Sequence, residues 1–193
     1  MRRLAFPFTC ALVLIASAAG SASAQVGCTP QRPAANRASP YDSVAFTISG
    51  KRAVVCYGRP SSKGRTMIGG SAVPYGKLWR TGANEPTIIH LPVAARIAGV
   101  KVPAGSYSLY TIPGETEWHV IVNKSISQWG HESAYSAKVK AEEVGHGTAK
   151  VVKPARPVET FTITAPKATG GADLILEWEN SRVSIPVRVE TGK

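Results

Sequence analysis

Residues 173–189 read DLILEWENSRVSIPVRV, and this stretch decides the fold. Apolar and polar side chains alternate on both sides of Asn180 and Ser181, with Leu174, Leu176 and Trp178 on one face of the first half. A period of two puts successive side chains on opposite faces of a strand, and Asn and Ser suit a tight chain reversal. The stretch therefore predicts a β-hairpin with one buried face.

The second half of this hairpin contains Pro186. Proline has no backbone N–H and cannot donate to a strand ladder, so it is found mainly on edge strands. We therefore predict that residues 183–189 form an edge strand, and that Pro186 and Arg188 discourage association between sheets.

The same alternation recurs along most of the chain. Further strands are predicted at residues 44–48, 54–57, 87–91, 94–97, 107–112, 118–122, 148–152 and 159–164. About nine short strands with turn signals at regular spacing are typical of an antiparallel β-sandwich or a jelly-roll-like barrel. We expect an all-β domain of this class, interrupted at residues 125–144 by a turn or two of helix.

The N-terminal residues have the order of a secretory signal. Arg2 and Arg3 precede an apolar run at residues 4–19, and Ala22-Ser23-Ala24 matches a cleavage site, so residues 1–24 are predicted to be a signal peptide. Residues 25–40 lack apolar periodicity and are expected to be a flexible leader, followed by a single domain at residues 41–190. The prediction places the protein in the periplasm or outside the cell, without a transmembrane segment.

The chain is strongly basic. Its 23 Lys and Arg residues exceed its 12 Asp and Glu residues, giving a formal net charge of +11. Such a surplus favours anionic partners. We expect the partner to be an anionic or carbohydrate component of the cell envelope. We expect no nucleic-acid partner, because aromatic residues are few and an exported protein is separated from the genome.

Two of the three cysteines, Cys28 and Cys56, follow the predicted signal. Disulfides persist in exported proteins, so a Cys28–Cys56 bridge is one prediction. The other is lipid attachment to Cys28, for which Gly27 is suitable but Gln25 is not. Both remain open at the level of sequence.

Catalytic and metal-binding patterns are weak. The four histidines His90, His119, His131 and His146 lack the spacing of a zinc site, so no metal and no cofactor are expected. No Gly-x-Ser-x-Gly motif is present. Glu85 is the acidic residue nearest to the cationic part of the chain, and it is the residue that any acid–base chemistry would use.

The best candidate for a site is a cationic stretch that ends at residues 79–86, WRTGANEP. Between Ser43 and Asn84 there are seven Lys or Arg residues and no Asp or Glu. Arginine binds carboxylates and phosphates in bidentate fashion, and aromatic rings can stack on arginine or on sugars. The candidate binding residues are Arg59, Arg65, Trp79, Arg80, Asn84 and Glu85. The competing interpretation is a structural role, in which an Arg–Glu pair beneath a Trp satisfies loop carbonyl groups.

Several phrases of the sequence resemble a known family. They are YGRP at residues 57–60, KGR at 63–65, VPYGKLWRTGANE at 73–85 and PAGSYSLYTIP at 103–113. Together they are similar to DUF2911, a family of bacterial exported proteins known only as a domain of unknown function, and the similarity extends from about Ser39 to Glu190. The resemblance implies a β-rich domain in the envelope or outside the cell, and does not require cysteine at position 56. It implies no activity or catalytic residue.

These observations favour a binding or accessory module for an anionic or sugar-like envelope component. The alternative is an envelope hydrolase acting on glycans or small esters, with Glu85 as acid or base and Arg65 or Arg80 holding charge. Whether the protein is an enzyme is left open, although a binding role is favoured.

Overall fold

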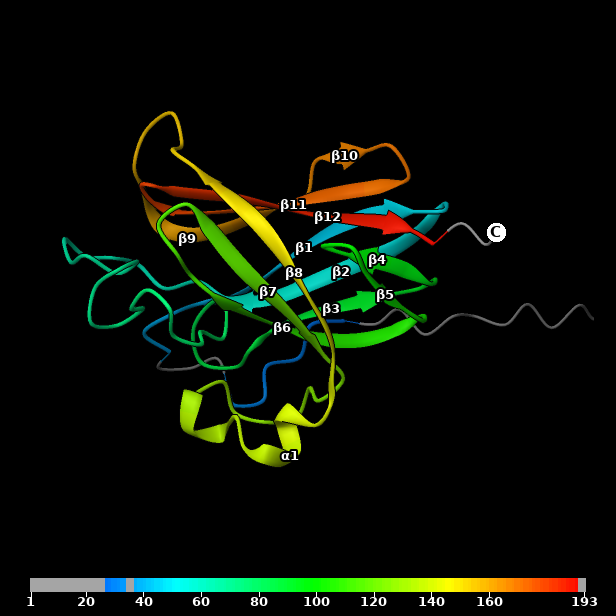
Figure 1. Cartoon of the computed structure of the whole chain (residues 1–193), viewed down its shortest axis with the longest axis horizontal. Coiled ribbons are helices and arrows are strands. Elements are labelled where there is room, and N and C mark those ends of the chain that lie inside the picture. Colours follow the sequence, from blue (N-terminus) through cyan, green and yellow to red (C-terminus); the bar gives the residue numbers. More distant parts are fainter. Residues whose placement is uncertain (1–26, 34–36, 191–193) are drawn as a thin grey trace, which may run out of the picture.

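A computed structural model describes residues 27–33 and 37–190, and the predicted signal peptide lies outside these residues. The described chain is almost entirely antiparallel β-structure, which confirms the predicted fold class. Figure 1 shows the strands in two crossing layers with the helical turns at one end. None of the helices in the described part has the length and apolar character needed to span a membrane.

The first layer contains six strands in the order β1-β2-β3-β6-β7-β8. Their bounds are β1 Tyr41–Ile48, β2 Lys51–Gly58, β3 Thr87–Leu91, β6 Gly105–Ile112, β7 Glu117–Asn123 and β8 Glu143–Val152. The second layer contains β12 between β11 and β4, with β9 and β10 on β11 and β5 on β4. Their bounds are β4 Ala95–Ile97, β5 Val100–Val102, β9 Val158–Thr164, β10 Lys167–Ala168, β11 Gly171–Glu179 and β12 Ser181–Val189. The short strands β5 and β10 are absent from the sequence prediction.

The hairpin predicted at residues 173–189 is β11–β12, but the prediction that its second strand is an edge is wrong. Strand β12 pairs with β11 along its length, and on its other side it pairs first with β8 at Arg182 and Val183, then with β4 at residues 187–189. Pro186 lies where the outer partner changes from β8 to β4, and its carbonyl accepts from the N–H of Ala98. A missing donor is tolerated at that break in the ladder.

The core lies between the layers and is centred on aromatic rings. Trp79 lies 5.2 Å from Phe161, 5.8 Å from Trp118 and 5.9 Å from Trp178, measured between ring centroids. All four are buried and come from both layers and from the long connection between β2 and β3. Edge and stacked packing of such rings joins the layers into one core.

The outer face of the first layer is also covered. Val54, Cys56, Ile88, Tyr110 and Ile121 are buried although they do not belong to the central core. Two segments cover this face. One is the N-terminal strap, which we define as residues 27–33 and 37–40, and the other is the helical insert, residues 124–142, which contains the 3₁₀ turn Glu132–Ala134 and α1 Ala137–Lys140.

The strap occupies the region predicted to be a flexible leader. In the described residues it is joined to β2 by a Cys28–Cys56 disulfide and to the first layer by the hydrogen bond from Arg59 N–H to the carbonyl of Pro40. Its disulfide and the contacts that join it to the rest of the fold are formed with residues far along the chain, so no local periodicity reveals them.

Candidate functional site

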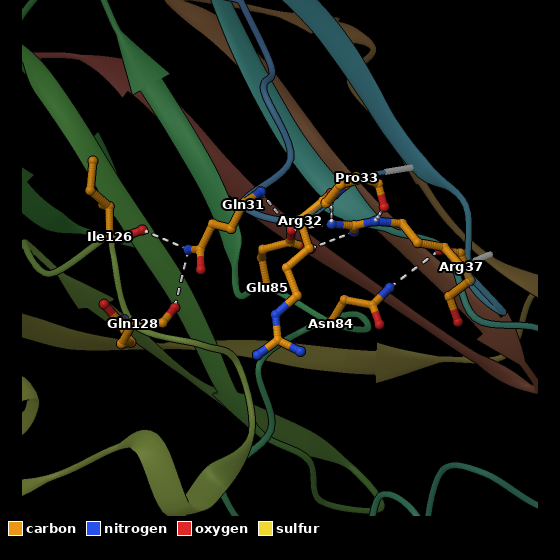
Figure 2. Close-up of polar contacts among 9 residues, drawn as sticks. Gln31, Arg32, Pro33, Arg37, Asn84, Glu85, Ile126 and Gln128 are labelled. Carbon is orange, nitrogen blue, oxygen red and sulfur yellow. Dashed lines mark hydrogen bonds and ion pairs between the residues drawn. The ribbon is translucent and has the colours of Figure 1, made fainter. Parts of the chain in front are cut away.

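The strap, the helical insert and residues 79–86, here called the signature loop, meet around Glu85. The carboxylate of Glu85 is 1% exposed and accepts hydrogen bonds of 2.7 and 2.5 Å from the Arg37 guanidinium. It also accepts from the backbone N–H of Gln31 at 2.8 Å. Figure 2 shows these groups converging on Glu85 from the strap.

The Glu85 carboxylate is held in its ionised form. Burial opposes ionisation, but the bonds from Arg37 and from backbone N–H groups outweigh it and keep the pKa of Glu85 below its ordinary value. The Arg37 side chain is itself only 7% exposed. Both carboxylate oxygens are engaged and shielded from solvent, which is the arrangement of a structural counterion.

The signature loop owes its shape to two non-glycine residues in the left-handed region. Thr81 has φ 57° and Asn84 has φ 66°. A β-branched residue rarely adopts this conformation unless its surroundings impose it. Buried hydrogen bonds do so here, because Thr81 Oγ1 pairs with Thr111 Oγ1 at 3.1 Å and Thr87 Oγ1 donates to the Thr81 carbonyl.

Asn84 and Arg80 connect the signature loop to its neighbours. The Asn84 side-chain amide donates to the carbonyl of Ser39 in the strap at 3.2 Å. The backbone carbonyl of Asn84 accepts from the Gly130 N–H in the insert. Arg80 Nη1 donates to the Gly130 carbonyl at 3.4 Å and to Glu132 at 3.1 Å. The loop therefore bonds to both the strap and the insert, in addition to the direct contacts between these two segments.

One guanidinium at this junction faces outward. Arg32 lies over the Trp129 ring, with its Cζ 4.0 Å from the ring centroid, and the residue is exposed. In the part of the chain that the structure describes, its side chain has no hydrogen-bond acceptor, since the nearby Glu85 is taken by Arg37. Figure 2 shows the Arg32 guanidinium projecting away from Glu85, on the side of Asn84.

Two arginines thus contact consecutive residues of the insert: Arg32 stacks on Trp129, and Arg80 bonds to Gly130. We call Arg32, Arg80 and Trp129 the arginine platform. Arg80 is only partly satisfied, because its Nε is buried with no partner among the described residues and its ion pair with the 42% exposed Glu132 is open to solvent. A stacked guanidinium keeps its N–H edge available, which is the geometry that binds carboxylate or phosphate.

Other residues singled out in the sequence lie elsewhere. Arg59 donates to the Phe161 carbonyl, to Thr162 and to Asp42, which places it against β9. Arg65 is exposed and donates to carbonyl groups of its own loop at residues 61 and 62. Within the described residues, neither forms a hydrogen bond or ion pair with Arg80 or Glu85.

Trp79 is part of the core and is 3% exposed, so its ring is not available to a ligand. Its Nε1 donates to the Gly82 carbonyl at 3.0 Å. This bond helps to close the signature loop over the aromatic core. Of the six candidate residues, Arg80, Asn84 and Glu85 lie at the junction, whereas Arg59, Arg65 and Trp79 do not share it.

Sequence reasoning missed Gln31, Arg32, Arg37 and Trp129. They lie in the presumed leader and in the irregular insert, where no periodic pattern draws attention to them. The signal that could have found the strap residues is the pairing of Cys28 with Cys56. It places the leader across β2, beside the strand β3 that follows Glu85.

The comparison with family models identifies one match. The model described as a protein of unknown function (DUF2911) matches residues 39–187. The chain belongs to the DUF2911 family. No curated protein and no solved structure matches it.

The family match places the signature loop and the insert inside the DUF2911 region and most of the strap before it. Arg80 and Trp129 are therefore within the family domain, and Arg32 is contributed by the preceding extension. Among the described residues, no group of three or more His, Cys, Asp or Glu side chains could hold a metal ion.

Proposed function

We propose that this DUF2911 protein is an exported binding or accessory module that holds an anionic group of an envelope component at the arginine platform. The observation that carries the proposal is the outward guanidinium of Arg32, stacked on Trp129 without an acidic partner in the described chain, next to Arg80 on the following residue. Export is taken from the sequence expectation of a signal peptide.

The charge distribution supports an anionic ligand. Most of the 12 acidic residues already have side-chain partners within the protein, including the junction residues Glu85 and Glu132. The cationic surplus therefore remains on exposed lysines and arginines, which attract anions from solution. Arg32 differs from the exposed lysines because its guanidinium lies over an aromatic ring.

The ligand chemistry is a phosphate or a carboxylate on a larger envelope molecule. A planar guanidinium forms two parallel bonds with either group, whereas an ammonium group acts as a point charge. The half-buried indole of Trp129 also offers an edge against which a sugar ring carrying that group can pack. No observation favours the hydrolase, because Glu85 is enclosed.

The test is a titration followed by the NMR signal of the Trp129 indole N–H. Inorganic phosphate and glucuronate are the anionic probes, and glucose is the neutral one. We expect saturable shifts with the anions, at least tenfold weaker binding in Arg32→Ala, and weaker binding in Arg80→Lys because an ammonium cannot copy the fork.

Arg52→Ala is the matched control. Arg52 is an exposed arginine near the start of β2, about 20 Å from the Gly58 end of that strand at ~3.3 Å per residue. Its removal should change the dissociation constant by less than about twofold, the small change expected for a distant charge screened by salt. Equal losses of anion affinity in the Arg32 and Arg52 variants would show that binding depends only on the net charge of the protein. Absence of a saturable shift would reject the site.

A further inference from the structure

We infer that the Cys28–Cys56 disulfide is a redox latch that holds residues 27–33 of the strap, and with them Arg32, in place over the first layer. This inference concerns the regulation of the proposed anion site and rests on that function for its ligand-binding part. The movement of the strap stands on its own observations.

The first observation is the difference in burial across the strap. No residue in 27–33 is buried, and Gln31 and Arg32 are exposed. The groups beneath are enclosed, because Cys56 is 0% exposed and Glu85 is 1% exposed. Residues 27–33 therefore cover buried groups although none of them is itself buried. Their docking gains little from the hydrophobic effect.

The second observation is the nature of the remaining contacts. Apart from the disulfide, the segment is held by the Gln31 N–H to Glu85 bond, by Gln31 Nε2 bonds to the carbonyls of Ile126 and Gln128, and by the Arg32–Trp129 contact. The Arg37 guanidinium also donates to the carbonyls of Arg32 and Pro33, and both of these bonds are exposed to solvent. The Gln31 side-chain bonds are exposed to solvent. Hydrogen bonds in contact with water contribute little net free energy to the docking of residues 27–33. The loss of conformational entropy on ordering each of these backbone residues opposes that docking.

The disulfide changes this balance by joining residues 28 apart in sequence. A covalent link removes most of the conformations that the free segment would otherwise sample. Without it, residues 27–33 keep only their noncovalent contacts. Residues 37–40 of the strap have other anchors. Arg37 pairs with Glu85, the Ser39 carbonyl accepts from Asn84, and the Pro40 carbonyl accepts from the N–H of Arg59.

The opening step is thiol–disulfide exchange. A thiolate of a dithiol reductant attacks the sulfur of Cys28, which is half-buried, and Cys56, which is fully buried, leaves as thiolate and takes up a proton. The second thiol of the reductant then displaces Cys28. The S–S bond is replaced by two thiols, and the reductant is oxidised to a disulfide by the same two electrons.

The test is hydrogen–deuterium exchange of the purified protein, resolved by peptide, before and after full reduction with dithiothreitol. We expect at least tenfold faster exchange in residues 27–33, carried by the Gln31 amide that donates to Glu85, with unchanged exchange in residues 37–40, β2 and β3. Alkylation and mass measurement confirm that both thiols have formed. Unchanged exchange in residues 27–33 of the fully reduced protein would overturn the latch, as would loss of protection throughout β2 and β3.

Two variants keep the test decisive if reduction has side effects. Cys28→Ser should show the open pattern without reductant and no response to dithiothreitol. Thr29→Ala alters the exposed neighbouring residue and should behave like the unmodified protein in both states. A Cys28→Ser protein with residues 27–33 still protected contradicts the latch.

The regulatory part is tested by titrating the oxidised and reduced forms with inorganic phosphate. We expect at least tenfold weaker binding after reduction, because Arg32 leaves the platform with the strap. If hydrogen exchange shows that the reduced protein is open and its phosphate affinity equals that of the oxidised protein, the coupling between the disulfide and the anion site is overturned. If the oxidised protein binds no phosphate, the proposed function fails, while the exchange experiment still decides whether the latch exists.

Discussion

Glu85 illustrates how a single residue can organise a site without acting in it. Its carboxylate receives the Arg37 guanidinium from 48 residues earlier and the Gln31 N–H from 54 residues earlier. Because the pair is almost fully enclosed, each charge depends on the other for compensation. This arrangement neutralises Arg37 and leaves Arg32 as the outward-facing cation of the strap.

Replacing Arg37 by Ala should destabilise the protein strongly. The change leaves the Glu85 carboxylate buried without its counterion, and breaking a buried pair in this way costs about 3–5 kcal/mol. Urea unfolding measures the difference. The matched control is Arg182→Ala, which removes the more exposed partner of Glu177 and should cost less than about 1 kcal/mol. Similar losses in both variants would contradict the structural role of Glu85.

Glu85 should also contribute to acid sensitivity. Its pKa is lowered in the folded protein, so its ionised form stabilises the fold above the ordinary value of 4.5, and this stabilisation is lost as the pH falls through the folded-state value. Glu85→Gln should be less stable at neutral pH, and its free energy of unfolding should fall less steeply below about pH 5. Parallel curves of unfolding free energy against pH for the two proteins would show that Glu85 does not titrate as described.

At the scale of elements, the signature loop is the support for two segments that lack extensive cores of their own. The strap and the helical insert reach it from opposite directions in sequence, and the insert bonds to the loop backbone at Gly130. A Cβ at Gly130 would lie 2.3 Å from the Asn84 carbonyl oxygen and 2.5 Å from Arg80 Cδ. Only glycine lets the insert approach this closely.

Gly130→Ala should therefore push the insert away from the signature loop. A contact with backbone atoms cannot be relieved by rotating a side chain, and overpacking of this kind costs about 1–3 kcal/mol. Thermal unfolding gives the loss of stability, and the Trp129 indole signal reports the displacement of the platform. Gly27→Ala is the control, because no atom lies within 4 Å of its added Cβ. A silent Gly130→Ala variant would show that the approach is looser than described.

For the whole molecule, the aromatic cluster is the feature that unites the two layers. Phe161 from β9 is fully buried and contacts Tyr57, Trp79 and Trp178 through edge or tilted ring packing. Strand β8 continues from one layer into the other by pairing with β7 and then with β12. Because a single core fills the space between them, the layers should unfold together.

Phe161→Ala should lower the free energy of unfolding by about 3–5 kcal/mol by leaving a cavity in this core. Unfolding should remain one transition, with tryptophan fluorescence and far-UV circular dichroism changing at the same urea concentration. Val152→Ala is the control, since Val152 is 53% exposed and should change little. Two separate transitions would indicate that the layers are independent.

The sequence by itself determined most of the strands, although not the short β5 and β10, because alternation of side chains and turn residues act between neighbours in the chain. It correctly predicted β11 and β12 and the helical interruption before β8. It also drew attention to Arg80, Asn84 and Glu85, but it left open whether they bind a ligand or support the loop.

Only the tertiary structure decided which distant segments meet. It placed the strap over the first layer, paired Arg37 with Glu85, and set Arg32 on Trp129. It also placed the strand containing Pro186 inside the sheet, at a break between two partners. These outcomes depend on how the sandwich closes and on which buried charges find compensation. Both are properties of contacts across the whole fold, and no local pattern of residues contains them.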